Sequence, residues 1–284
     1  MRVAALDDFL ARRTPGKLVL IFLALLLAGA FVLSLLKDIE PKPLPMIFTT
    51  ALVSVTCLAT NSAFAYAFGA KSKTESVIIT ALILALIISP VAPNNLDGLA
   101  LPLFASSWAM ASKYLIAPNR RHLFNPAAFG VAMADPITGH AASWWVGSYW
   151  LLPLVLGGGL LLLRKIRCLD LLLSFTVTAL GMIALMSSSG YAWMFIRESF
   201  LRSAFSFFAI VMLTEPRTLP IGRLWRIAFG ALVGIFFAPA THIGTLRFTP
   251  ETALVIGNIF AAGAKCVRRQ KSRQTKLSTS LESS

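Results

Sequence analysis

"LVLIFLALLLAGAFVLSLL", at residues 18–36, decides the fold class of this chain. The stretch holds no charged residue and shows no polar–apolar alternation. A helix of about 20 apolar residues spans the hydrocarbon core of a bilayer, whereas a membrane β-strand alternates in polarity. We therefore predict a transmembrane helix. The alternative is a cleaved signal peptide flanked by Arg12, Arg13 and Lys17, but the run is too long and too apolar for one.

The composition extends this prediction to the whole chain. Of the 284 residues, 57% are hydrophobic and 13% are charged, whereas soluble domains hold about 25% charged residues. We expect an all-α polytopic membrane protein with about ten transmembrane helices, at residues 18–36, 46–68, 76–93, 99–116, 123–137, 144–163, 169–187, 199–214, 227–244 and 250–266. Shortened or broken helices are expected at 123–137 and 199–214, because both segments are short for a full span.

Positive charge sorts the predicted loops into two sets. Of the 26 Lys and Arg residues, one set of alternate loops holds only Lys37, Lys42, Arg197, Arg202 and Arg247. The positive-inside rule places the other set, with both termini, in the cytoplasm. We expect a cytoplasmic segment at 1–17 and a disordered basic tail at 267–284 that touches lipid headgroups. The basic residues are dispersed over short loops, which argues against nucleic acid as a partner.

Several kinds of chemistry lack their signature in this sequence. Cys57, Cys168 and Cys266 are far apart and form no C-x-x-C motif, so no zinc or cluster site is predicted. The three histidines do not form the facing pairs that a di-haem cytochrome needs. The sequence also has no phosphate-binding loop, no dinucleotide fingerprint and no Ser-His-Asp signature. Any electrons that this chain handles must therefore come from another chain.

The ten segments divide into two five-helix halves, at 18–143 and 144–266. An odd number of spans per half makes the second half enter the membrane from the opposite side, as in inverted repeats. The third segments, "TALILALIISPVAP" (80–93) and "SAFSFFAIVMLTEPRTLP" (203–220), both end in a polar residue followed by Pro. Such breaks are tolerated where protein or a water-lined cavity covers them. The alternatives are a helix end at the interface for Ser89-Pro90 and an interfacial ion pair between Glu215 and Arg217.

"FNPAAFG", at 124–130, opens the short fifth segment. Asn125 is a good N-cap, and Pro126 suits the first helical position. A capped helix start is one interpretation. The other is that the free amides of this helix start, with Asn125, bind a polar ligand or phosphate. Gly130 would then allow another helix or a flat ring to approach closely.

Three motifs, in this order, resemble the RnfD/NqrB family: "ESVIITALILALIISPVAP" (75–93), "NRRHLFNPAAFG" (119–130) and "MLTEPRTLPIGRLWRIAFGALVG" (212–234). Members of this family are the membrane flavoprotein subunits of Rnf complexes and of sodium-pumping NADH:quinone reductases. The resemblance implies ten helices in two inverted halves within the bacterial cytoplasmic membrane. It also implies flavin-linked electron transport, coupled in the best-known members to ion movement. The partners would be other membrane and soluble redox subunits, or a flavin or iron–sulfur reductase.

The resemblance also bears on the cofactor. Family members carry FMN esterified to a Thr in a motif like D-x-x-[ST]-G-A-T, and the nearest stretch here is "DPITGHAAS" (135–143). Ala141 stands at the acceptor position and has no hydroxyl, which leaves Thr138 or Ser143 as substitute acceptors. We therefore expect a non-covalent flavin, FMN or riboflavin. Its site residues are expected to be Asn125, Pro126, Gly130, Thr138, Thr214, Glu215 and Pro216.

Phe124, Phe129 and Phe208 are candidates to flank the flavin ring, with core packing as the alternative. Two other functions stay open from the sequence. One is a cofactor-free solute or ion transporter or channel, because inverted repeats with broken helices suit transport equally well. The other is a membrane anchor for a soluble reductase.

Overall fold

The structure is a computed structural model that describes residues 12–71, 73–117, 122–187, 191–202, 204–238, 242–243 and 246–282. Its first half contains α2 (Pro15–Leu35), α3 (Pro43–Ala67), α4 (Thr74–Ile87), η1 (Asp97–Leu99), α5 (Ala100–Leu115) and α6 (Pro126–Thr138). Its second half contains η3 (Tyr149–Leu151), α7 (Leu152–Ile166), α8 (Leu169–Met186), α9 (Ala192–Leu201), α10 (Ala204–Phe207), the π-helical η4 (Phe208–Met212), α11 (Arg223–Phe237) and α12 (Pro250–Glu282). The strands β1 (His242–Ile243) and β2 (Leu246–Arg247) form a two-residue antiparallel ladder.

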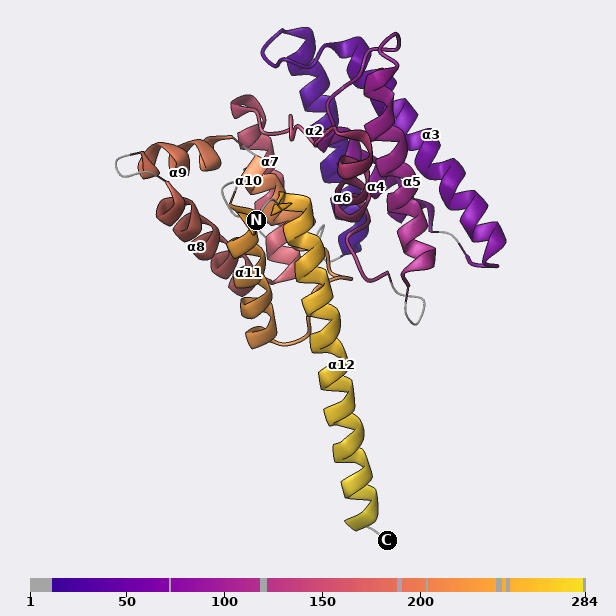
Figure 1. Cartoon of the computed structure of the whole chain (residues 1–284), viewed down its shortest axis with the longest axis vertical. Coiled ribbons are helices and arrows are strands. Elements are labelled where there is room, and N and C mark those ends of the chain that lie inside the picture. Colours follow the sequence, from indigo (N-terminus) through magenta and orange to yellow (C-terminus); the bar gives the residue numbers. More distant parts are fainter. Residues whose placement is uncertain are drawn as a thin grey trace.

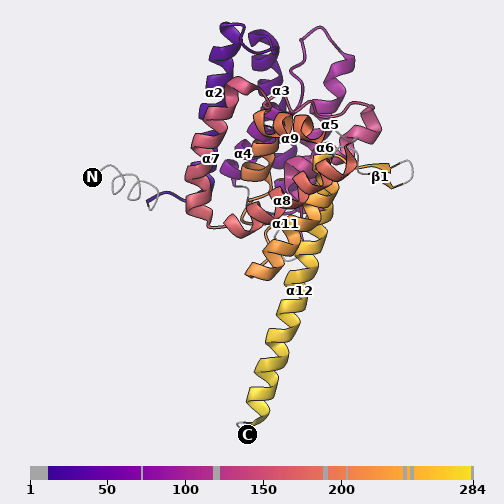
Figure 2. The same ribbon diagram turned by 90° about the vertical axis from the view of Figure 1, so that its left-hand side faces the viewer.

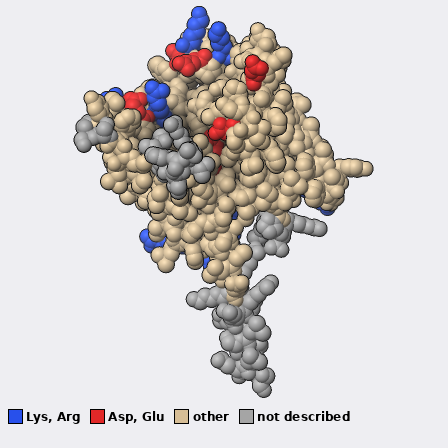
Figure 3. All heavy atoms as spheres, in the orientation of Figure 1, with Lys and Arg blue, Asp and Glu red and all other residues tan. Residues whose placement is uncertain are grey.

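The helices carry apolar side chains on their outer faces. Leu25, Leu160, Leu173 and Val177 are 63–69% exposed, and most of the face in Figure 3 is neither acidic nor basic. Helices that are apolar all round belong in lipid or in a large core. Among the described residues, α2, α3, α8 and the stretch Tyr149–Ile166 are long and apolar enough to cross a membrane. The predicted all-helical membrane class is thus supported, and each of the ten predicted segments contains a helix.

The two halves repeat one order of helix packing. In the first half, α2 packs on α4, α3 on α4 and α5, and α5 on α6. In the second half, α7 packs on η4, α8 on η4 and α11, and α11 on α12. The halves lie side by side in Figure 1 and meet where α2 packs on α7 and α6 packs on α12 (Figures 1 and 2). By this order of packing, each of the five helices of the first half corresponds to the helix at the same place in the second half.

The break at Ser89-Pro90 follows the end of α4 rather than interrupting it. α4 ends at Ile87, and its last carbonyls find partners in the loop that precedes α7. The Trp144 amide donates to the Ile87 carbonyl at 2.9 Å, and the Val146 amide donates to the Leu86 carbonyl at 3.2 Å. The predicted Ser89-Pro90 break is therefore a helix end covered by protein, as lipid requires.

The second break has the same arrangement with the halves exchanged. The π-helical turn closes with a hydrogen bond of 2.9 Å from the Leu213 amide to the Phe208 carbonyl. The Met212 carbonyl then accepts a hydrogen bond of 3.3 Å from the Asn125 side chain of the first half. The predicted break after residue 212 is thus covered from across the molecule.

The segment 199–214 is broken, as expected, because α9 ends at Leu201 and a second helical stretch covers Ala204–Met212. The sequence pattern missed α9 because this helix is short and carries Arg197 and Glu198. The tail at 267–284, expected to be disordered, continues α12 to Glu282 and projects from the bundle in Figure 1. It holds Lys, Arg and Gln but no Gly or Pro, a composition that favours helix.

Candidate functional site

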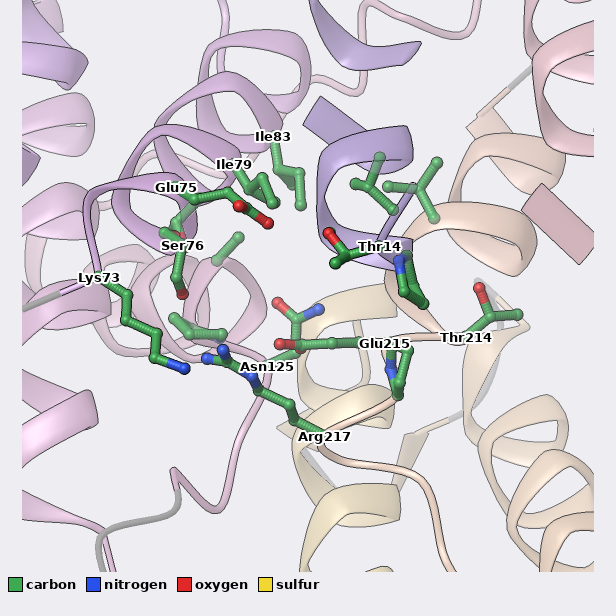
Figure 4. A pocket seen from close by; sticks show the side chains of 18 of the residues that line it. Thr14, Lys73, Glu75, Ser76, Ile79, Ile83, Asn125, Thr214, Glu215 and Arg217 are labelled. Atoms are coloured by element: carbon green, nitrogen blue, oxygen red, sulfur yellow. The ribbon is translucent and has the colours of Figure 1, made fainter. Parts of the chain in front are cut away.

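A cavity of about 520 Å³ lies where the two halves meet, and we call it the first cavity. The starts of α2, α4 and α6 line it from the first half. The end of α7, η4 and the loop that follows η4 line it from the second half. Figure 4 shows Lys73, Glu75 and Ser76 on one side, Thr14 on another, and Asn125, Glu215 and Arg217 between them. Its apolar walls come from Val19, Ile79, Ile83 and Val211.

Five of the seven predicted site residues line the first cavity. They are Asn125, Pro126, Thr214, Glu215 and Pro216. These residues come from segments that lie about 90 positions apart in the chain, and the structure brings both segments to one place. Gly130 and Thr138 lie elsewhere.

Asn125 joins three parts of the structure and is 2% exposed. Its side-chain oxygen accepts from the Ala128 amide at 3.1 Å, which confirms the predicted N-cap of α6. Its side-chain amide donates to the Met212 carbonyl at 3.3 Å. Its backbone amide donates to the side-chain oxygen of Asn258 in α12 at 2.7 Å. Asn125 therefore holds the wall of the first cavity together as well as lining it.

Replacing Asn125 separates these roles. We expect Asn125→Ser to keep the cap and lose the bond to Met212, whereas Asn125→Ala loses both. A lost N-cap costs about 0.5–2 kcal/mol, and a buried carbonyl left without its partner costs about 1–3 kcal/mol. The midpoint of thermal unfolding in detergent should therefore be highest for the wild type, lower for Asn125→Ser and lowest for Asn125→Ala. Equal midpoints for the Ser and Ala variants would show that the cap contributes nothing.

Glu215 offers one carboxylate oxygen for a ligand. Its Oε1 lies 3.4 Å from Nε2 of His122. Its Oε2 is buried and has no hydrogen-bond partner within the described part of the chain. The ion pair with Arg217 that the sequence left open is not among the salt bridges of the described residues. A buried carboxylate oxygen without a donor is costly, so a donor from a bound molecule would stabilise this site.

The sequence did not point to the α4 and α2 side of the first cavity. Lys73 and Glu75 come from the start of α4, and Glu75 approaches the first turn of α2, where a side chain at Gly16 would collide with its carboxylate. Only the resemblance motif that begins at Glu75 marked this region. The side chains of Lys73 and Arg217 balance those of Glu75 and Glu215 in the cavity lining.

Gly130 lies instead where α6 packs on α5, and Thr138 lies at the end of α6. A β-carbon at Gly130 would collide with the Ala105 carbonyl of α5, so Gly130 serves the approach of a helix. The Thr138 hydroxyl donates to the Ala134 carbonyl at 3.0 Å. Thr138 ends α6, about 20 Å along the helix from Asn125 at 1.5 Å per residue. The acceptor position, Ala141, lines a second cavity of about 640 Å³ with Ser89-Pro90.

The two sets of loops that differ in positive charge line different cavities. Glu40–Lys42, Asn95 and His140 line the second cavity, and these residues belong to the set of loops with few basic residues. The first cavity is lined from the basic set, by segments at Thr14, Lys73 and Arg217. Helices α2, α4 and α6 connect one cavity to the other, so the two cavities lie at opposite ends of these helices.

The aromatic candidates do not line the first cavity. Phe124 and Phe129 stack on each other with ring centroids 4.9 Å apart. Phe208 is fully buried against Phe175 and Phe237. Core packing therefore explains all three rings.

The first cavity combines apolar walls with a few charged and hydrogen-bonding side chains. Within the described ranges, no group of three or more His, Cys, Asp or Glu side chains comes together. No protein-family model and no curated protein matches the chain. The functional proposal therefore depends on the first cavity and on the sequence motifs that reach it.

Proposed function

We propose that this chain is a membrane-embedded flavin-binding subunit of an electron-transfer complex, similar to the RnfD/NqrB family. A non-covalent flavin, FMN or riboflavin, would occupy the first cavity. The observation that carries the proposal is the buried Oε2 of Glu215, which has no hydrogen-bond partner among the described residues and lies beside Asn125 in a cavity built from both halves. Small-molecule pockets of 300–1,000 Å³ combine apolar walls with a few placed polar groups.

The chemistry of a flavin ring suits this lining. The pyrimidine edge of the isoalloxazine presents one N–H donor and two carbonyl acceptors. The Glu215 carboxylate would accept from the N–H, and the side chains of Lys73 and Arg217 would donate to the carbonyls. The apolar edge of the ring would lie against Ile79, Ile83 and Val211. When bound, the flavin would supply the one- and two-electron chemistry that protein side chains lack.

The proposal includes ten spans in two inverted five-helix halves. The repeated order of helix packing supports the internal repeat, and the odd number of helices per half supports the inversion. The first cavity then opens at the cytoplasmic face of a bacterial cytoplasmic membrane, because its loops belong to the basic set. Both termini would be cytoplasmic. An electron donor such as a soluble flavin or iron–sulfur reductase would reach the cavity from that face, and other membrane redox subunits would pass the electrons on.

A transporter or channel without a cofactor is the second candidate. The observation that favours it is the second cavity at the other end of α2, α4 and α6. A cavity at each end of these helices suits alternating access. A membrane anchor for a soluble reductase is a third candidate, and a tight soluble partner without flavin would favour it.

The test uses protein purified from its native membrane. We expect visible flavin absorbance at about one flavin per chain, lost when the protein is denatured. A fluorescent band on a denaturing gel would instead mean covalent flavin and would point to Thr138 or Ser143 as the acceptor. A folded protein without flavin would contradict the proposal. Solute flux into liposomes would then distinguish the transporter from the anchor.

A further inference from the structure

A lysine that sequence reasoning did not single out lies behind the first cavity. Lys113, in the last turn of α5, does not line the cavity itself. Its Nζ donates to the Ser76 carbonyl at 3.0 Å, to the Ser76 hydroxyl at 3.3 Å and to the Thr80 hydroxyl at 3.1 Å. Ser76 and Thr80 both line the cavity. Lys113 therefore reaches the cavity through the residues to which it is bonded.

The geometry suits a fixed cation. A protonated lysine has three hydrogens to donate and no acceptor, and α4 supplies three acceptors for them. The described ion pairs include none that neutralises Lys113. The charges that act on it include the carboxylate of Glu215 and the guanidinium of Arg217, both of which line the cavity. The ammonium is thus held in place without a carboxylate of its own.

Among the described residues in and directly behind the cavity lining, the charges then leave one positive charge. Lys73 and Arg217 are matched by Glu75 and Glu215 in the lining, and Lys113 adds a cation that no carboxylate of this group offsets. A fixed charge that acts over a short distance through a medium of low polarity changes binding equilibria strongly. The cavity should therefore favour a ligand that gains one negative charge.

We propose that Lys113 is a positioning residue that makes the first cavity prefer the reduced, anionic form of its flavin. This inference rests on the proposed function. A flavin that takes two electrons and one proton gains one negative charge on its pyrimidine part, and nearby charge tunes its electronics. The electrons come from an external reductant, which is dithionite in the test below. Lys113 acts through Ser76 and Thr80 and raises the reduction potential of the flavin.

The test compares wild type with Lys113→Met, which removes the charge, and Lys113→Arg, which keeps it. Two quantities are measured on the purified full chain. The first is the dissociation constant of added riboflavin. The second is the reduction potential of the bound flavin, titrated with dithionite against a reference dye. We expect Lys113→Met to weaken the binding of the reduced flavin about tenfold relative to the binding of the oxidised flavin. That change lowers the potential by about 30 mV for a two-electron couple, whereas Lys113→Arg should stay near wild type.

Lys113→Gln provides the same test if the Met variant fails to fold, because its amide can still donate to Ser76. A neutral variant whose bound riboflavin has the wild-type reduction potential would overturn the inference. Lys113 would then have a structural role only. The same shift in Lys113→Arg as in Lys113→Met would also overturn it, because geometry rather than charge would be the cause. A wild-type chain that binds no riboflavin and carries no flavin would remove the proposed function and this inference together.

Discussion

Changing Glu215 to Gln is expected to weaken flavin binding by roughly 10- to 100-fold and to leave the fold intact. The substitution keeps the size of the side chain and an oxygen that can face His122, but it removes the negative charge of the carboxylate to which the buried Oε2 belongs. A hydrogen bond to a charged group is worth about 1.5–3 kcal/mol, and about 1.4 kcal/mol corresponds to a tenfold change in affinity. Riboflavin binding to the purified variant measures the effect directly.

Glu198→Gln is the matched control for this prediction. Glu198 lies on α9, outside the first cavity, and bonds to Tyr149 at 2.6 Å and to Arg202 at 3.1 Å. We expect it to bind riboflavin as the wild type does. Wild-type affinity in Glu215→Gln would place the ligand elsewhere. A similar loss in both variants would mean that any lost carboxylate perturbs the protein.

Gly130→Val is expected to destabilise the protein by crowding the contact between α5 and α6. The added β-carbon would meet the Ala105 carbonyl and the backbone nitrogen of Ala109, the latter at 3.0 Å. Backbone atoms cannot rotate away as a side chain does, so α5 and α6 would have to separate. Overpacking typically costs about 1–3 kcal/mol and sometimes more. We expect a lower thermal midpoint and a lower yield of folded protein.

Gly181→Val provides the comparison, because nothing lies within 4 Å of a β-carbon built at Gly181 of α8. This variant should unfold close to the wild-type midpoint. Wild-type stability in Gly130→Val would contradict the close approach of α5 and α6. A Gly130→Val protein that stays folded but has lost flavin would return Gly130 to the site.

Local patterns predicted the helices and the cap of this chain, because both depend on neighbouring residues. The apolar run at 18–36 became Pro15–Leu35, and Asn125-Pro126 starts α6 as expected. That Asn125 and Glu215 line one site was expected only from the family resemblance. Pattern alone could not bring these residues together, since about 90 residues separate them in the chain.

The rest of the site depends on which face of α4 turns inward. α4 is apolar on almost every side, so its sequence does not indicate whether Ser76 and Thr80 face lipid, a neighbouring helix or a cavity. Only the packing of α4 against α2 and α3 decides this. Lys113 was missed because the sequence pattern counted it among the basic residues of a cytoplasmic loop and could not show that it packs against α4.

The hydrogen bonds that cover the two breaks have a consequence for how the chain enters the membrane. The end of α4 is satisfied by Trp144 and Val146, which the ribosome makes about 60 residues after Ile87, within about 3–12 s at 5–20 residues per second. The Met212 carbonyl needs Asn125, which is inserted long before it. A nascent chain that has reached residue 146 can therefore close the first break early and then serve as the template on which the rest of the second half closes the other. When the gene is divided just after the codon for residue 146, the N-terminal fragment should insert into the membrane alone. The C-terminal fragment should insert only when the N-terminal fragment is expressed with it.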